Sequence, residues 1–459
     1  MNNNIEQLDV AIIGAGLTGL TTAHYLNKAN KKVAIFEKQE RCGGVINTAT
    51  QDGFTYEEGP NTGIVGTPEV ADLFEELKDL CELEIANDEV EKRYILKNSK
   101  WEALPSGLIG GIKTPLFSLK DKFRLLGEPF RSKGKNPHES LADLVKRRLG
   151  QSLLDYAIDP FILGVYSGDP KQLVPKYALP KLYNLEQDYG SFIGGAIKKK
   201  FEKKDEELKK ATRKVFSTKG GLSSLTNALY KSVGEGNFYF NANQLVIKPE
   251  NGKYHISVSV NGETKEFIAN NVITTTGAFA LPELLPFIDK DELKKLTSLY
   301  YARVVEVVLG FKNWKGFNLD GFGGLIPHKE KRDILGVLFL SALLKNRAPK
   351  NGALLCLFIG GVRRDELVDL SDIEITELVE REVKDLMQLD DFSPELFKII
   401  RHNKAIPQYG VDSGERFEAI NQLESKFPGL ILGGNMHNGI GMADRITQGK
   451  QMAYKVINK

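Results

Sequence analysis

Apolar positions recur along the chain with two different periods, and the order in which the periods change predicts a mixed α/β protein. Residues 10–13 form an apolar run of strand length, residues 17–29 carry apolar side chains at helical spacing, and residues 33–37 form a second apolar run. A glycine turn separates the first run from the helix. This order of strand, helix and strand is typical of the start of a doubly wound sheet.

The period changes again in the rest of the chain. Residues 69–80 have apolar positions at helical spacing, and residues 93–105 alternate as in a short hairpin. From about residue 95 to 215 the pattern is mostly helical. Strands are then expected at 238–241, 254–260, 266–269, 272–275, 301–312, 335–341 and 354–360, and helices near 291–299 and 372–388.

These shifts predict two domains and one insertion. A Rossmann-type nucleotide-binding domain is expected to collect residues 1–92, 216–285 and 411–459. Residues 93–215 are expected to form a mostly helical insertion, and residues 286–410 a mixed-sheet domain for the substrate. The predicted fold class is therefore α/β with a mixed α+β part.

Composition narrows the class of protein. The chain has 62 basic and 60 acidic residues, a net charge of +2, which gives no global electrostatic reason to bind nucleic acid. The cysteines Cys42, Cys81 and Cys356 are odd in number, and neither they nor the histidines have metal-ligand spacing. Neither a targeting peptide nor a run of 18 apolar residues is recognisable. We therefore expect a cytoplasmic protein without a metal site.

The first turn carries a complete dinucleotide fingerprint. Gly14, Gly16 and Gly19 follow an apolar strand and open a helix, and the acidic Glu37 ends the next strand. Gly14 permits the tight turn, Gly16 lets the backbone approach a pyrophosphate, and Gly19 allows close packing of helix and sheet. The helix N-terminus stabilises phosphate charge, and Glu37 is expected to accept hydrogen bonds from ribose hydroxyls.

Three further glycine-rich segments favour FAD over NAD. Residues 41–44 place a cation and two glycines just beyond the ribose site, where a second pass of backbone would meet the pyrophosphate of FAD. Residues 59–62 form another tight turn, and residues 432–444 repeat the order of strand, glycine turn and helix. The N-terminus of that last helix would favour negative charge on a reduced flavin ring.

Additional motifs occur in order along nearly the whole chain. They are Lys92-Arg93-Tyr94-Ile95 with Ala103-Leu-Pro-Ser-Gly107, Asp159-Pro-Phe-Ile-Leu-Gly164-Val-Tyr-Ser-Gly168-Asp-Pro170, Tyr189-Gly-Ser-Phe-Ile-Gly-Gly195 and Phe216-Ser-Thr-Lys-Gly-Gly-Leu222. With these motifs the chain resembles the FAD-dependent amine oxidase superfamily and, within it, the oxygen-dependent protoporphyrinogen oxidases. Covalent flavin attachment in related amine oxidases uses a cysteine near the C-terminal turn, whereas the last cysteine here is Cys356, so the resemblance implies non-covalent FAD.

The resemblance implies a set of binding residues. FAD contacts are implied for Gly14, Ala15, Gly16, Leu17, Thr18, Gly19, Glu37, Lys38, Arg41, Gly43, Gly44, Gly59, Pro60, Asn61, Thr62, Gln244, Leu245, Asn435, Ile440, Gly441 and Met442. Arg93 matches a cation that binds a substrate propionate, with an exposed strand-end arginine as the alternative. Gly164 matches a glycine of the substrate-cavity wall, and no residue is assigned a catalytic role.

The activity implied by the resemblance is oxidation of protoporphyrinogen IX to protoporphyrin IX in heme biosynthesis. Dioxygen would be the acceptor in three two-electron steps that produce hydrogen peroxide. The poorly soluble substrate suggests peripheral contact of the insertion with the cytoplasmic face of a membrane and with neighbouring heme-pathway enzymes. Phe117, Phe123, Leu125, Leu126 and Phe130, interspersed with Lys120, Lys122, Arg124 and Arg131, have the required apolar and basic character. The lysine-rich residues 198–214 are either a solvated face or a second contact.

Several alternatives remain open from the sequence. The same fold acting on coproporphyrinogen III would need more cations, because that substrate has four propionates instead of two. A flavin amine oxidase or a carotenoid-type desaturase is more distant, since the chain has no Tyr or Trp between Val411 and Met452 to form an aromatic cage. An FAD-binding protein without turnover is the third class.

Overall fold

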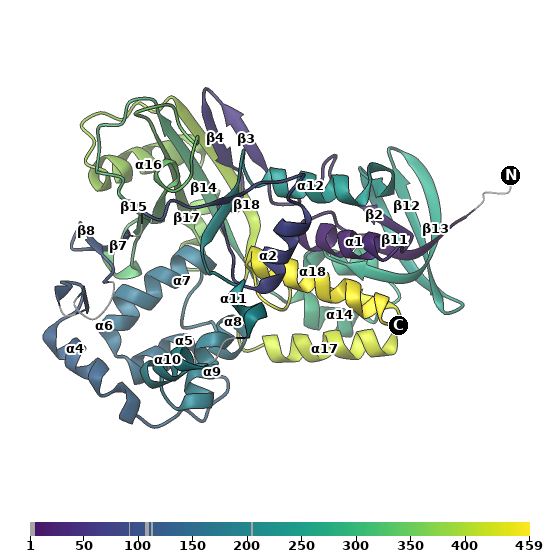
Figure 1. Ribbon diagram of the computed structural model, residues 1–459, viewed down its shortest axis with the longest axis horizontal. Coiled ribbons are helices and arrows are strands. Elements are labelled where there is room, and N and C mark those ends of the chain that lie inside the picture. The colour runs from purple at the N-terminus through teal and green to yellow at the C-terminus, as the bar shows by residue number, and fades with distance from the viewer. Residues whose placement is uncertain (1–4, 91, 106–109, 112, 203–204) are drawn as a thin grey trace.

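The computed structural model describes residues 5–90, 92–105, 110–111, 113–202 and 205–459, and two seven-stranded sheets organise the fold (Figure 1). The first sheet has the order β10-β2-β1-β13-β12-β11, with β19 paired to β13. Neighbours are parallel from β10 to β13 and between β13 and β19, whereas β11, β12 and β13 are antiparallel. The strands are β1 (Glu6–Ile13), β2 (Val33–Phe36), β10 (Phe238–Tyr239), β11 (Ala242–Glu250), β12 (Lys253–Val260), β13 (Glu263–Thr274) and β19 (Leu430–Leu432).

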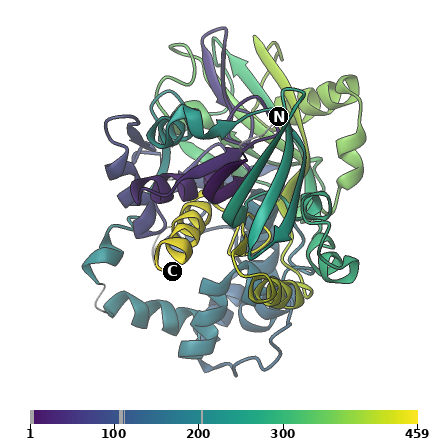
Figure 2. The same ribbon diagram turned by 90° about the vertical axis from the view of Figure 1, so that its right-hand side faces the viewer.

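Helices bury both faces of the parallel part of this sheet. Val10 and Ile12 of β1 lie in the core that includes α1 (Leu17–Lys28), α2 (Pro68–Glu76), α12 (Ser223–Val233) and α18 (Met442–Ile457). Ala11 and Ile13 face the opposite core with α13 (Leu281–Leu284), α14 (Lys290–Thr297) and α17 (Ser413–Lys426). The first and last helices lie side by side, and the Thr22 hydroxyl donates to the Gly449 carbonyl at 3.1 Å (Figures 1 and 2). The two ends of the chain therefore complete one layer.

The second sheet has the order β18-β14-β17-β16-β15-β7-β8, in which only β15 and β7 are parallel neighbours. α16 (Asp372–Leu386) packs on one of its faces. Its strands are β7 (Lys92–Lys97), β8 (Lys100–Ala103), β14 (Tyr301–Phe311), β15 (Gly321–Leu325), β16 (Ile334–Phe339), β17 (Ala353–Gly360) and β18 (Leu396–Pro407), and α15 (Leu340–Leu343) follows β16. Small sheets of β3 (Thr48–Gln51) with β4 (Phe54–Glu57), and of β5 (Gly63–Ile64), β9 (Val215–Thr218) and β6 (Leu83–Ile85), complete the strands.

A group of helices lies below the second sheet in the view of Figure 1. A π-helical turn, Leu154–Ile158, leads directly into α7, whose first turn carries Pro160. The helices are α4 (Leu119–Leu126), α5 (Leu141–Arg148), α6 (Gln151–Leu153), α7 (Asp159–Tyr166), α8 (Pro175–Ala178), α9 (Pro180–Tyr189) and α10 (Phe192–Phe201). The short α11 (Glu206–Lys209) follows and lies beside α2. None of the helices in the described parts of the chain is long and apolar enough to cross a membrane.

The predicted mixed α/β fold with mixed sheets is confirmed. Two expectations need correction in detail. The helix expected over 69–80 ends at Glu76, and the two strands expected at 266–269 and 272–275 are one strand, β13, which pairs with β12 along its first half and with β19 at its end. Ser106 and Gly107, which end one motif, and Lys203 and Lys204 of the lysine-rich segment lie outside the described residues.

Candidate cofactor and substrate site

The turn between β1 and α1 has the backbone geometry of a nucleotide cradle. Gly14 has a φ of +103°, and a Cβ on Gly19 would lie 2.0 Å from the Gly14 carbonyl oxygen. Both glycines are therefore required by the protein itself. Gly16 is different, because a Cβ there would meet nothing within 4 Å and its φ of −72° suits any residue. The open space beside Gly16 fits a bound pyrophosphate at the N-terminus of α1.

Glu37 lies at the end of β2 with its carboxylate fixed. One oxygen accepts the backbone N–H of Ala15 at 2.8 Å and the other accepts that of Gln39 at 2.9 Å. Each oxygen keeps a lone pair for a ribose hydroxyl. The start of β11 lies beside it, since the Ala242 N–H donates to the Glu37 carbonyl at 2.9 Å.

The neighbours of Glu37 differ in what they present to a ligand. Lys38 is exposed, whereas Leu17 and Thr18 are buried in the first turn of α1. Gln244 sits in a bulge of β11 with a φ of +50° and an exposed side chain, while Leu245 is buried in the core. Only the backbone of Leu245 is therefore suited to the predicted contact.

Arg41 shapes the second glycine-rich segment. Its guanidinium donates to the carbonyls of Cys42, Gly44 and Ile46, each at 3.0 Å. The Gly43 N–H donates to the Ala15 carbonyl at 2.8 Å, so this segment lies against the first turn. The sequence predicts an FAD contact for Arg41 and a pass of backbone at the pyrophosphate; in the structure the guanidinium uses these donors to fold that backbone.

The segment Gly59, Pro60, Asn61 and Thr62 packs on the second glycine-rich segment, residues 41–46. A Cβ on Gly59 would lie 2.1 Å from the carbonyl oxygen of Val45. The Asn61 amide donates to Glu306 Oε1 at 2.8 Å, and His402 Nε2 lies 3.2 Å from Glu306 Oε2. The carbonyl oxygen of the Asn61 side chain is buried and has no hydrogen-bond partner among the described residues. An unpaired acceptor at this place fits a ligand that brings a donor.

The C-terminal turn lies between β19 and α18 and is held by side chains from other elements. The Tyr409 hydroxyl lies 2.8 Å from the carbonyl oxygen of Asn435, and the Tyr301 hydroxyl lies 3.2 Å from Asn435 Oδ1. Ile440 is partly buried against the core that contains Tyr409, Gly441 is exposed at the N-cap of α18, and Met442 is buried. The exposed backbone of Gly441 is thus available at the start of a long helix.

Sequence reasoning missed the two arginines that hold this turn, whereas it placed His437 in the turn and favoured a solvent-facing or hydrogen-bonded structural role for it. Arg445 and Arg416 are buried and donate to its carbonyls, and His437 bonds to the Leu432 carbonyl through Nε2 at 2.8 Å. Burial lowers the pKa of His437 to about 4, so the ring is neutral and structural at pH 7. Nothing in the local sequence marks the two arginines, because their carbonyl partners are brought near them only by the fold of the turn.

The predicted substrate residues Arg93 and Gly164 lie at one corner of the second sheet. A Cβ on Gly164 of α7 would lie 2.4 Å from Leu325 Cδ2 of β15. In the parallel register, Leu325 pairs with Ile95 and Gly323 with Arg93, so Arg93 and Leu325 share one face, two residues apart. Arg93 is exposed, and the one side-chain interaction that it makes within the described chain is with the Phe322 ring, 5.3 Å away.

The adjoining face of α7 is apolar and exposed. Phe161, Gly164 and Val165 follow helical spacing, and the two larger side chains are 39% and 43% exposed. A wall of this kind next to a free guanidinium suits a bulky apolar ligand that carries a carboxylate.

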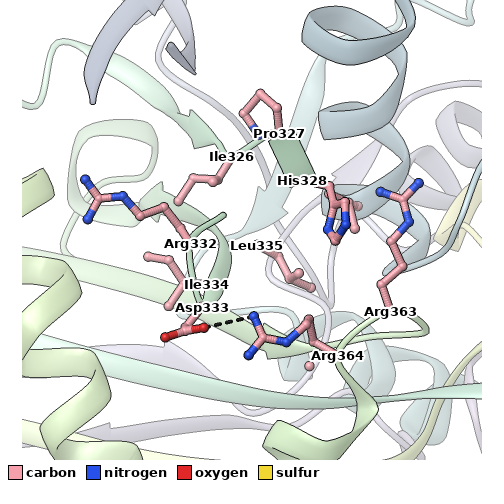
Figure 3. Close-up of a pocket in the computed structure, with 11 residues that line it drawn as sticks. Ile326, Pro327, His328, Arg332, Asp333, Ile334, Leu335, Arg363 and Arg364 are labelled. Carbon is pink, nitrogen blue, oxygen red and sulfur yellow. Dashed lines mark hydrogen bonds and ion pairs between the residues drawn. The ribbon is translucent and has the colours of Figure 1, made fainter. Parts of the chain in front are cut away.

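A shallow, open hollow lies beside this corner, and its walls include Leu163, the neighbour of Gly164 in α7 (Figure 3). Its arginines are already paired: Arg363 bonds to Asp159 and Asp169, Arg364 to Asp333 and Glu366, and Arg332 to Glu382 and Asp385. Burial lowers the pKa of His328, which is therefore neutral at pH 7. The hollow has no surplus positive charge for a second substrate carboxylate.

The geometry fits FAD, and the individual contacts stay predictions. Segment 41–46 touches both segment 14–19 and segment 59–62. A Cβ on Gly434 would lie 3.1 Å from the carbonyl oxygen of Thr275, whose hydroxyl bonds to the Gly14 carbonyl. In the described ranges, no cluster of three or more His, Cys, Asp or Glu side chains is placed to hold a metal ion.

Comparisons with known proteins agree with this geometry. Residues 17–457 match the family described as flavin containing amine oxidoreductase. The chain is 32% identical to the mitochondrial protoporphyrinogen oxidase of Nicotiana tabacum, over 98% of this chain and 94% of that protein. It is 27% identical to the coproporphyrinogen III oxidase of Bacillus subtilis (strain 168), over 96% of each.

A solved structure shows the same fold. The crystal structure of "Putative protoporphyrinogen oxidase from Exiguobacterium sp. 255-15" superposes with a TM-score of 0.81 at 23% identity and covers 99% of both chains. Together with the match over residues 17–457, this establishes that the chain belongs to the flavin containing amine oxidoreductase family and is an FAD-dependent oxidase.

Proposed function

We propose that this protein oxidises protoporphyrinogen IX to protoporphyrin IX in heme biosynthesis, with dioxygen as the acceptor and hydrogen peroxide as the second product. The names of the tobacco and Bacillus relatives support a porphyrinogen substrate. Bound FAD supplies the two-electron acceptor chemistry, in three successive turnovers.

One observation carries the choice of substrate. Arg93 is an exposed cation without a carboxylate partner in the described chain, and it lies on the sheet face that meets α7. Protoporphyrinogen is a large apolar ring with two propionates on one side. The exposed apolar face of α7 suits the ring, and Arg93 suits one propionate, because a guanidinium binds a carboxylate through two parallel hydrogen bonds.

The alternative substrate, coproporphyrinogen III, has four propionates. A site for it requires several cations that are not neutralised by the protein. The three arginines of the neighbouring hollow are each paired with two carboxylates, so they do not meet that requirement. This difference favours protoporphyrinogen.

The test adds each porphyrinogen to the purified yellow protein without oxygen and records the loss of flavin absorbance. Air is then admitted, and porphyrin fluorescence and hydrogen peroxide are followed. We expect protoporphyrinogen to bleach the flavin faster. Bleaching by coproporphyrinogen alone would replace the proposed substrate, and bleaching by neither would refute porphyrinogen oxidation.

A pair of variants tests the role of Arg93. We expect Arg93→Gln to raise KM for protoporphyrinogen about tenfold or more, because a hydrogen bond between charged groups contributes about 1.5–3 kcal/mol. Lys92→Gln is the control, since Lys92 is adjacent and exposed but is already paired with Asp320 at 2.6 Å. Equal effects of the two substitutions on KM would exclude a specific contact of Arg93 with the substrate.

We also propose a cytoplasmic protein with peripheral contact to a membrane, where neighbouring heme-pathway enzymes exchange poorly soluble substrates. Leu119, Phe123, Leu126 and Phe130 are 71%, 70%, 72% and 91% exposed on and just after α4. The sequence expectation needs two corrections, because Phe117 is buried and Leu125 packs on the same core. Lys122, Arg124 and Arg131 donate to backbone carbonyls, so the apolar side chains are the better support for membrane contact.

A further inference from the structure

A buried arginine without a counter-ion lies beneath the C-terminal turn. Arg445 is in the first turn of α18 and is 9% exposed. Within the described chain no carboxylate pairs with it, and its Nε has no hydrogen-bond partner. Its other donors contact the carbonyl oxygens of Gly434, His437, Asn438 and Gly439 and the side-chain oxygen of Gln448.

The nearest carboxylate is occupied elsewhere. Asp444 accepts the Gly441 N–H at 3.0 Å and so caps the helix. Burial lowers the pKa of Arg445, but a guanidinium stays protonated at neutral pH. A buried charge that is solvated by carbonyl dipoles alone is costly. The N-terminus of α18 adds partial positive charge at the same place. Both features favour an anion at this turn.

A second buried arginine provides a contrast. Arg416 donates to the Met436 carbonyl of the same turn at 3.2 Å. It also pairs with Asp412 at 2.6 Å and donates to the Ser413 hydroxyl. Arg416 therefore holds the turn as a neutral pair, whereas Arg445 holds it and leaves a net positive charge.

We propose that Arg445 is an electrostatic positioning residue that stabilises the reduced, negatively charged flavin and so raises its reduction potential. The inference rests on the proposed flavin contacts of Asn435, Ile440, Gly441 and Met442, and it is independent of which porphyrinogen is oxidised. A unit charge in a protein interior acts on a nearby charge much more strongly than in water. The charge of Arg445 is therefore expected to stabilise the reduced, negatively charged flavin more than the neutral oxidised flavin.

The experiment measures the reduction potential of FAD in the full-length holoprotein, and in parallel the dissociation constant of sulfite, which forms an anionic adduct with the oxidised flavin. Arg445→Gln removes the charge, Arg445→Lys keeps it, and Arg416→Gln is the matched control. We expect Arg445→Gln to shift the potential to more negative values and to weaken sulfite binding about tenfold or more. Arg445→Lys and Arg416→Gln should both stay close to the wild type.

A further variant keeps the arginine and its hydrogen bonds. Gln448→Glu places a carboxylate where Gln448 Oε1 now lies, 2.8 Å from Arg445 Nη1. The resulting ion pair should shift the potential in the same direction as Arg445→Gln. Unchanged potentials in both Arg445→Gln and Gln448→Glu would overturn the proposal. Equal loss of affinity for oxidised and reduced FAD would also overturn it, because that result assigns the charge to the pyrophosphate. A shift of the reduction potential of the same size in Arg416→Gln would mean that Arg445 only holds the turn in shape and has no electrostatic role.

Discussion

At the scale of single residues, replacing two glycines of the first turn by alanine is expected to have different effects: one substitution should lower stability and the other should weaken FAD binding. Gly19→Ala brings a methyl group to 2.0 Å from the Gly14 carbonyl oxygen, so α1 must move away from β1. We expect a loss of about 1–3 kcal/mol in stability. Gly16→Ala meets nothing within 4 Å and should leave the stability of the apoprotein within about 0.5 kcal/mol. It should nevertheless weaken FAD binding about tenfold, because the methyl group enters the space of the pyrophosphate.

Thermal unfolding of both apoproteins and titration with FAD separate these effects. Normal FAD affinity in Gly16→Ala would contradict a pyrophosphate at this turn. The sequence was informative about these positions because their requirement is local: a turn, a close approach and an acidic residue at the end of the next strand. It placed Arg41 and Asn61 among the FAD contacts but gave no sign of the carbonyl and carboxylate groups that hold them. It did not mark Arg445 at all, because only the folded chain brings the carbonyl partners of Arg445 near.

At the scale of elements, a buried ion cluster joins the helices that surround the proposed substrate site. Arg148 of α5 is fully buried and pairs with Glu128 and, at 2.7 Å, with Glu186 of α9. Arg148→Met leaves two buried carboxylates without this partner, and we expect a loss of about 3–5 kcal/mol at neutral pH. Arg147→Met is the control, because Arg147 also pairs with Glu186 but its side chain is 31% exposed. Its effect on the unfolding temperature should be clearly smaller.

The loss of stability in Arg148→Met should depend on pH, and the direction of that dependence follows from the two carboxylates. Burial opposes ionisation of Glu128 and Glu186, but hydrogen bonds outweigh it and hold both pKa values below the ordinary 4.5. Their contribution to stability is therefore complete above pH 4.5 and is lost as the pH falls through the lowered values. In Arg148→Met the carboxylates lose that support and take up protons at higher pH. The difference in unfolding temperature between wild type and variant should narrow on acidification, and a constant difference would contradict the assignment.

Helices and strands with a clear hydrophobic periodicity could be predicted from the sequence. Strands whose burial depends on which other strand they pair with could not. The first strand, helix and strand were found because every apolar position is buried on one face or the other of a covered sheet. β18 was missed, because it pairs only with β14 at the edge of its sheet and most of its residues are partly or fully exposed. β13 was divided in two, because its change of partner from β12 to β19 is invisible in its own sequence.

At the scale of the whole molecule, the exposed apolar side chains of α4 are concentrated at the end of the helical group farthest from the first sheet (Figure 1). The triple substitution of Leu119, Phe123 and Leu126 by serine should abolish co-sedimentation with vesicles that contain anionic lipid. Burying such side chains at an interface contributes about 1.5–3 kcal/mol each. The substitutions should not unfold the protein, because no residue of α4 is buried.

Ile373→Ser is the control for that experiment. Ile373 is equally exposed, at 72%, but it lies on α16 beside the second sheet and away from the helical group. If apolar exposure alone drove binding, this control would also weaken it, whereas a directed surface on α4 predicts no change. Such a surface would place the substrate corner formed by α7 and β7 near the lipid, since Ile95 of β7 and Leu125 of α4 pack in one core and Gly164 of α7 lies against Leu325 of the same core. In the triple variant, the oxidation of a porphyrinogen supplied in vesicles should then slow, while the oxidation of detergent-dispersed porphyrinogen stays unchanged. Equal slowing in both assays would show that the substitutions damage the substrate site and not the membrane contact.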